Sequence, residues 1–229
     1  MKAFHAYDIR GIYNIDFNKK DVYKIGFFLP KYLKTKKVLV GRDVRVSSDE
    51  MFEYLTKGIN DAGADVYDIG LATTPMVYFS TAKYGFQASV QITASHNSKE
   101  YNGMKISREN ALPVGYDSGL RIIERMMNED EIIQVKERGS IKKFDVKDDY
   151  LAFLNSYKQD YSNLKIAIDC SNGMAALLIK DLLGNQPDYI FDDLDGTFPN
   201  HEANPLIPEN VVDLQNLVKE KKSDIGIIF

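Results

Sequence analysis

Short β-rich runs alternate with amphipathic helical patterns from about residue 20 to the end of the 229-residue chain. Alternation of this kind is typical of an α/β fold in which parallel strand connections dominate. The pattern predicts strands near residues 36–41, 64–70, 86–93, 103–107, 164–170, 187–191 and 223–229. We therefore expect two small α/β domains in tandem, each with a mixed, largely parallel sheet between helices.

Several residues mark where helices should begin or end. Asn18 is a suitable N-cap for the first helix, and Pro30 should kink or end that helix. Ser47 and Glu50 have the spacing of a capping box at the start of the second helix. Thr74, which is followed by proline, is a suitable N-cap for the third.

A charged segment at residues 136–147 shows little periodicity and is our candidate domain boundary. We expect one domain at residues 1–144 and a second at 145–229. The second should be incomplete at its C-terminus, because the chain stops at Phe229, on the last residue of a strand. Ligand loops in open α/β sheets lie just beyond the carboxyl ends of strands. The alternative is an ordinary C-terminal edge strand.

Charge and composition exclude several classes of partner. A net charge of −4 gives no broad basic surface, so we expect no nucleic-acid partner. Cys170 is the sole cysteine, which excludes an internal disulfide and fits a reducing compartment. No apolar run approaches the ~20 residues of a membrane span, and the N-terminus does not resemble a signal peptide. These features predict a cytoplasmic protein without a membrane partner.

The loop at Ala94–Asn102, between two predicted strands, is longer than the two to five residues of a usual hairpin connection. Its length favours a functional loop. A serine in a Ser-His-Asn run can be an activated nucleophile, a phosphorylated residue or a turn former. For Asn97 and Ser98, spacing alone favours turn formation.

Hydrolase chemistry is poorly supported, because the sequence contains no G-x-S-x-G elbow. We also expect that a histidine cannot easily turn back onto the serine beside it. Phosphate chemistry fits better, since Lys105 and Arg10 offer positive charge. No recognised nucleotide-binding loop is present, so the phosphate would not come from a nucleotide held in one.

The stretch TASHNSKEYNGMK resembles the phosphoserine loop of the α-D-phosphohexomutases, the phosphomannomutase/phosphoglucomutase family. Four further stretches resemble motifs of that family in the same order: HAYDIRG, VGRDVRVSS, IAIDCSNGMAA and GTFPNHEANPLIPEN. Five ordered matches along nearly the whole chain are far more specific than one tripeptide. The resemblance covers the first two of the family's four domains, the second incompletely.

The resemblance implies that Ser95 carries a phosphoryl group that it exchanges with a hexose phosphate through a bisphosphorylated sugar. It also implies catalytic roles for Lys105, Arg10 and His96, and substrate binding by Tyr7 and Asn97. Lys105 would act in acid/base chemistry or bind the phosphate. Simpler interpretations are a solvated, outward-facing Lys105, a local ion pair between Arg10 and Asp8, and a packing role for Tyr7. Arg42, Asp43 and Arg45 are assigned mainly to loop structure.

The resemblance also implies a Mg²⁺ cofactor, held by the phosphate on Ser95 and by aspartates of a loop expected directly after Phe229. The domains that read the sugar and hold its distal phosphate would likewise lie beyond this chain. We therefore expect the 229 residues alone to be inactive. The alternative is a stand-alone protein that binds a sugar phosphate or a partner without catalysis. The stretch at 101–120 is most similar to bacterial phosphomannomutases, which favours mannose phosphate over glucose phosphate.

Overall fold

The computed structural model describes residues 2–229, and their contacts divide them into two compact units. The first unit extends to Ala94 and continues from Glu100 to Val146. The second comprises Lys147–Phe229 together with the short stretch Ser95–Lys99. The division falls two residues after the boundary that the sequence suggested, and the loop stretch is grouped with the second unit.

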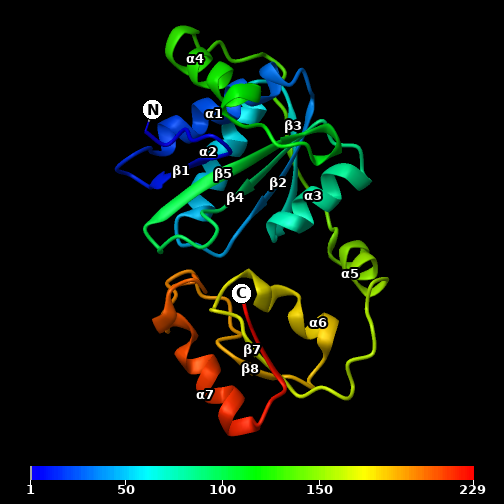
Figure 1. Cartoon of the computed structure of the whole chain (residues 1–229). Coiled ribbons are helices and arrows are strands. Elements are labelled where there is room, and N and C mark those ends of the chain that lie inside the picture. The colour runs from blue at the N-terminus through cyan, green and yellow to red at the C-terminus, as the bar shows by residue number, and fades with distance from the viewer. Residues whose placement is uncertain (1) are drawn as a thin grey trace. The chain divides into compact units, whose positions relative to one another are not determined.

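The first unit contains a six-stranded sheet in the order β1-β5-β4-β2-β3-β6 (Figure 1). β2 is parallel to both β3 and β4, and β3 is parallel to β6, whereas β5 is antiparallel to β1 and β4. The strands are β1 (Ile9–Ile12), β2 (Lys37–Arg42), β3 (Asp65–Leu71), β4 (Ala88–Ile92), β5 (Tyr101–Arg108) and β6 (Ile141–Lys143). This mixed, mostly parallel sheet confirms the predicted α/β class.

Helices cover both faces of this sheet. Figure 1 shows α3 on one face and α1, α2 and α4 on the other. Their bounds are α1 (Lys19–Tyr32), α2 (Ser48–Asp61), α3 (Thr74–Lys83) and α4 (Arg121–Glu129). The core of the unit lies between α1, α2, α4 and the sheet face formed by alternate strand residues such as Val90, Ile92 and Met104. Lys105, which follows Met104 on β5, therefore projects from the opposite face of the sheet.

Glycines bring α1 and α2 into close contact. A Cβ atom on Gly26 would clash with the backbone of Leu55, and one on Gly58 would clash with the carbonyl oxygen of Tyr23. Only glycine at both positions lets the two backbones approach this closely. The pair forms a rigid layer beneath the sheet.

The helix signals were partly right. Asn18 caps α1, and a capping box with Asp21 is present. Pro30 does not end α1, which continues to Tyr32, because Pro30 lies in the last turn and is buried. Ser47 precedes α2 without a capping hydrogen bond from its side chain, so the capping box predicted there is wrong. α3 is capped by Thr73 rather than Thr74.

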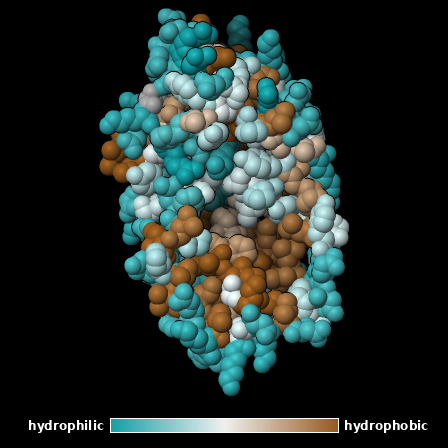
Figure 2. Space-filling model, in the orientation of Figure 1, coloured by the Kyte–Doolittle hydropathy of each residue, from teal (hydrophilic) through white to brown (hydrophobic). Residues whose placement is uncertain are grey.

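The second unit contains a three-stranded parallel sheet in the order β8-β7-β9. Its elements are α5 (Lys147–Asn155), β7 (Ile166–Asp169), α6 (Ile179–Leu183), β8 (Asp188–Ile190), α7 (Val212–Lys221) and β9 (Ile225–Ile228). Figure 2 shows apolar side chains gathered over this unit on the visible face. Leu206 is 84% exposed, and Ile225 and Phe229 are also exposed. By itself the unit leaves much apolar surface uncovered.

Two strands were missed in the sequence. β1 has four residues and β6 has three, and both carry charged residues, so neither shows a clear alternation. β6 lies in the charged segment that was interpreted as a domain boundary, and it pairs with β3. Within residues 2–229, no helix is both long and apolar enough to cross a membrane.

Candidate functional site

Ser95 lies three residues beyond the end of β4, in the loop that leads to β5. Its side chain is exposed, and its backbone has a φ of 58°. A residue other than glycine in this left-handed region costs roughly 1–3 kcal/mol and persists only when the surroundings hold it there. The carboxyl end of a strand is also where open α/β sheets place ligand-binding loops. Position and strain together single out Ser95 within its loop.

His96 turns back toward the serine beside it. The Oγ atom of Ser95 and the Nδ1 atom of His96 lie 3.3 Å apart. The histidine therefore does contact this serine, although we expected that it could not easily turn back onto the serine beside it. His96 is exposed and Asn97 is half-buried in the same loop.

A carboxylate joins the two cations that were predicted to act on phosphate. Arg10 lies on β1 and Lys105 on β5, and these strands pair in antiparallel fashion. The Oδ2 atom of Asp8 accepts from Arg10 Nη2 at 2.5 Å and from Lys105 Nζ at 3.0 Å. The ion pair considered for Arg10 is thus present, and it includes Lys105.

Lys105 is not the freely solvated lysine of the simpler interpretation. Its side chain is 25% exposed, because it lies along the sheet toward Asp8. Sequence reasoning named Asp8 only as a neighbour of Arg10 and missed its contact with Lys105. The YDIRG stretch shows only the spacing of Asp8 and Arg10, because the contact with Lys105 depends on the pairing of β1 with β5.

Gly103 allows β1 to approach β5 at this point. A Cβ atom there would clash with the carbonyl oxygen of Ile9 on β1. Arg10 is paired with Gly103 in the sheet. The glycine that follows Asn102 in the sequence therefore keeps Arg10 within reach of Lys105.

The environment of Asp8 keeps its carboxylate ionised. Burial acts to raise the pKa of Asp8, but the hydrogen bonds from Lys105 and Arg10 outweigh it and lower the pKa below its ordinary value. The pKa of the nearby Tyr78 is raised by burial and by the negative charge of Asp8. Two cations and one carboxylate leave this cluster with a formal net charge of +1, which suits a phosphate ligand.

Of the other predicted residues, Tyr7 directly precedes Asp8 in the sequence. Tyr7 is 84% exposed. The structure therefore groups Ser95 with His96, and Arg10 with Asp8 and Lys105. Asn97 belongs to the Ser95 loop.

The described residues do not form a metal site by themselves. Within residues 2–229, no three His, Cys, Asp or Glu side chains are grouped so that they could hold a metal ion. Mg²⁺ sites in proteins usually combine one or two carboxylates with phosphate oxygens and water. Ser95, once phosphorylated, would supply oxygen atoms of the phosphate, but the carboxylate ligands are not assembled here.

Comparisons with known proteins agree on one family. Residues 1–133 match the model for phosphoglucomutase/phosphomannomutase, alpha/beta/alpha domain I, and residues 148–229 match the model for domain II. A phosphomannomutase of Salmonella typhimurium strain LT2 is 38% identical over 241 residues. A phosphomannomutase of Vibrio cholerae serotype O1 is 36% identical over 244 residues. Each alignment covers 100% of this chain and 53% of the relative.

A solved structure shows the same fold. The phosphoglucomutase/phosphomannomutase family protein of Burkholderia thailandensis has a TM-score of 0.89 at 29% identity, over 99% of this chain and 52% of that one. This chain thus spans about half the length of the relatives it matches. It belongs to the phosphoglucomutase/phosphomannomutase family.

Proposed function

We propose that this chain is the N-terminal portion of a phosphohexomutase in which Ser95 carries the transferred phosphoryl group. One observation supports this most strongly: Ser95 is exposed in a left-handed conformation just beyond the carboxyl end of β4, within the matched domain I. A side chain held at a strand end in a strained conformation is suited to present its oxygen to a ligand.

The transfer has two halves. In the first, a bond forms between the phosphorus and a hydroxyl oxygen of the hexose phosphate, and the proton of that hydroxyl leaves to a base. The bond between phosphorus and the Ser95 oxygen breaks, and the Ser95 oxygen takes up a proton. The resulting bisphosphorylated sugar turns over. In the second half, the Ser95 hydroxyl oxygen forms a bond to the other phosphorus and loses its proton to a base. The bond between that phosphorus and the sugar oxygen breaks, and the released oxygen takes up a proton to give the isomeric hexose phosphate.

The residues of this chain contribute positive charge and hydrogen-bond donors to that exchange. A phosphorylated serine carries roughly −1.5 to −2 charge at neutral pH and needs cationic partners. Lys105 and Arg10 are the proposed partners, with Asp8 fixing both cations in place. His96 is the proposed neighbour that orients the Ser95 oxygen, and Tyr7 and Asn97 are proposed to contact the sugar phosphate.

The substrate we propose is mannose phosphate, with glucose phosphate as the second choice, because two of the compared relatives are named phosphomannomutase. Mg²⁺ and the remaining domains of the enzyme are proposed to complete the site. The 229 residues alone are proposed to lack turnover, and the enzyme is proposed to act in the cytoplasm.

Substituting the serine tests the proposal directly. In the complete enzyme, Ser95→Ala should abolish mutase turnover, whereas Ser98→Ala in the same loop should retain most of it. Unchanged turnover in Ser95→Ala would refute the phosphoserine mechanism.

A further inference from the structure

The segment that follows β2 holds both ends of the loop that carries Ser95. At the start of the loop, the backbone N–H of Asp43 donates to the carbonyl oxygen of Ile92 at 2.9 Å. At its end, Nη1 of Arg45 donates to the carbonyl oxygen of Tyr101 at 3.0 Å. Ile92 is the last residue of β4 and Tyr101 is the first of β5. A single short segment therefore spans the base of the loop.

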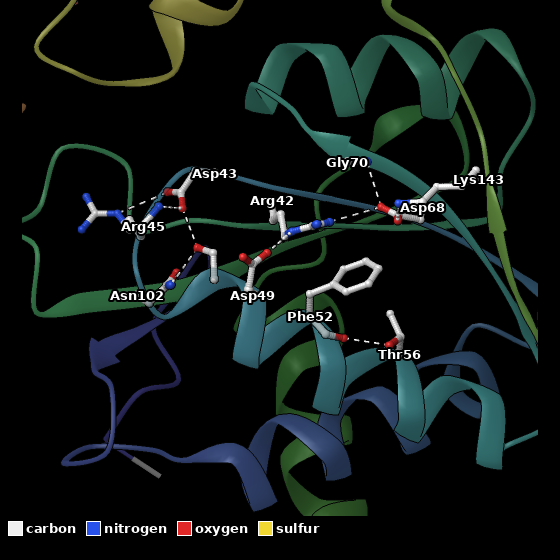
Figure 3. A network of polar contacts seen from close by, with 11 residues as sticks. Arg42, Asp43, Arg45, Asp49, Phe52, Thr56, Asp68, Gly70, Asn102 and Lys143 are labelled. Carbon is white, nitrogen blue, oxygen red and sulfur yellow. Dashed lines mark hydrogen bonds and ion pairs between the residues drawn. The ribbon is translucent and has the colours of Figure 1, made fainter. Parts of the chain in front are cut away.

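Arg45 is unusually placed for an arginine. Its side chain is only 1% exposed, and its Nε atom lies 3.2 Å from the Oδ2 atom of Asp43. Oδ1 of Asp43 also accepts from the backbone N–H of Arg45 at 3.0 Å and from Ser48 Oγ at 2.6 Å. Figure 3 shows Asp43 between Arg45 and the start of α2. The guanidinium therefore forms an ion pair with a buried carboxylate and also donates a hydrogen bond to the carbonyl oxygen of Tyr101.

A hydrogen-bond network extends this support to β5. Nδ2 of Asn102 donates to the hydroxyls of Ser47 and Ser48, at 2.8 and 3.0 Å. Oδ1 of Asn102 accepts from the backbone N–H of Gly103. These contacts fix the first residues of β5 to the same segment that carries Arg45. Ser47 has helical backbone angles (φ −84°, ψ −7°), unlike a typical N-cap residue, and does not cap α2.

Burying such a network is a costly way to stabilise a fold. A buried ion pair is often no more stabilising than apolar residues of the same volume, so its presence favours a role in specifying one geometry. The loop has a reason to need one geometry, because Ser95 occupies a left-handed conformation. Burial lowers the pKa of Arg45, and the like charge of Arg10 acts in the same direction.

We propose that Arg45, oriented by Asp43, is a positioning residue for the phosphoryl-carrying loop: it locks the loop's base so that Ser95 keeps its strained, exposed conformation. This inference rests on the proposed function for its consequence, because an unlocked loop would misplace the phosphoryl group. The opening of the loop itself can be measured without any phosphate or sugar.

Trypsin provides the measurement, because Lys99 is exposed within the loop. Cleavage after Lys99 requires the loop to open, and its rate follows the population of the open form. The substitution Arg45→Met removes the guanidinium and retains a similar length. We expect cleavage after Lys99, followed by mass spectrometry, to become at least about tenfold faster in this variant.

Arg42→Met is the matched control. Arg42 comes from the same strand end, but its partners are Asp49 at 2.7 Å and Asp68 at 3.3 Å, neither of which belongs to the loop (Figure 3). Cleavage after Lys99 should stay within about twofold of the unsubstituted protein in this variant. Equal acceleration in both variants, or none in Arg45→Met, would overturn the proposal.

Two further measurements separate positioning from general stability. Arg45→Lys keeps a positive charge beside Asp43 and should retain the urea midpoint. It should still accelerate cleavage, because an ammonium lacks the planar fork that reaches Asp43 and Tyr101 together.

Methylguanidinium should slow cleavage in Arg45→Ala but not in Arg42→Ala. If Arg45→Met does not fold, a folded Arg45→Lys that is cleaved at the unsubstituted rate would refute the proposal. If Ser95→Ala retained mutase turnover in the complete enzyme, the proposed function would be refuted, but the cleavage result for Arg45 would still stand.

Discussion

The ammonium of Lys105 donates to the carboxylate of Asp8 at 3.0 Å, although the two residues are 97 positions apart in the sequence. The antiparallel pairing of β1 with β5 creates this contact. Asp8 also holds Arg10, so one carboxylate orients both cations proposed to meet the phosphate. The first testable consequence concerns that carboxylate.

Asp8→Asn should destabilise the protein at pH 7 by about 1–3 kcal/mol, because the nearly buried carboxylate is replaced by a group that pairs poorly with two cations. The folded-state pKa of Asp8 is lowered from its ordinary value of 3.8. Its stabilising contribution is therefore present above that value and is lost as the pH falls through the folded pKa. Urea unfolding at neutral pH and near pH 3 measures the difference.

The exposed Asp117→Asn is the control for this experiment and should change the free energy of unfolding by less than about 0.5 kcal/mol. If Asp8→Asn lowered the free energy of unfolding as much near pH 3 as at pH 7, the charge of the carboxylate would not be the cause of the lost stability.

Gly58→Ala should destabilise the first unit by about 2 kcal/mol or more, because the added methyl group clashes with the carbonyl oxygen of Tyr23 where α1 crosses α2. The exposed neighbour Lys57 on α2 is the matched control, and Lys57→Ala should be nearly neutral. Thermal unfolding of the two variants compares them. Equal melting temperatures would contradict the close approach of these helices.

Cys170 should be inert in the folded protein. Burial and the charges of Asp192 and Asp169 raise the pKa of its thiol to about 12, and the thiolate is the reactive form. Modification by an aromatic disulfide reagent at pH 8 should be more than about a hundredfold slower in buffer than in urea. Because Cys170 lies in the second unit, rapid modification in buffer would show that this unit is open in solution.

Much of the architecture could be predicted from local patterns. The strands around residues 36–41 and 164–170 are apolar and β-branched, and the Asn18 cap follows from a local hydrogen bond. β1 and β6 could not be predicted, because segments of three or four residues that include charges show no alternation of apolar and polar residues. These two strands form only through their pairing with β5 and β3.

The candidate site depended on different information. Ser95, Lys105 and Arg10 were identified by resemblance to a family, since neither periodicity nor spacing distinguishes them from turn or surface residues. Arg45 was assigned mainly to loop structure, and that assignment missed its hydrogen bond to the carbonyl oxygen of Tyr101. A contact between residues 56 positions apart leaves no trace in the local sequence.

The phosphoryl group is proposed to be carried by Ser95, and mass spectrometry can locate it directly. Trypsin releases the peptide at residues 84–99, which contains Ser89, Thr93, Ser95 and Ser98. Fragmentation of this peptide by tandem mass spectrometry, on the complete enzyme isolated in its active form, locates any phosphate. We predict one phosphate, on Ser95, that is lost in Ser95→Ala. A phosphate on another residue of the peptide, or none while turnover proceeds, would contradict the account.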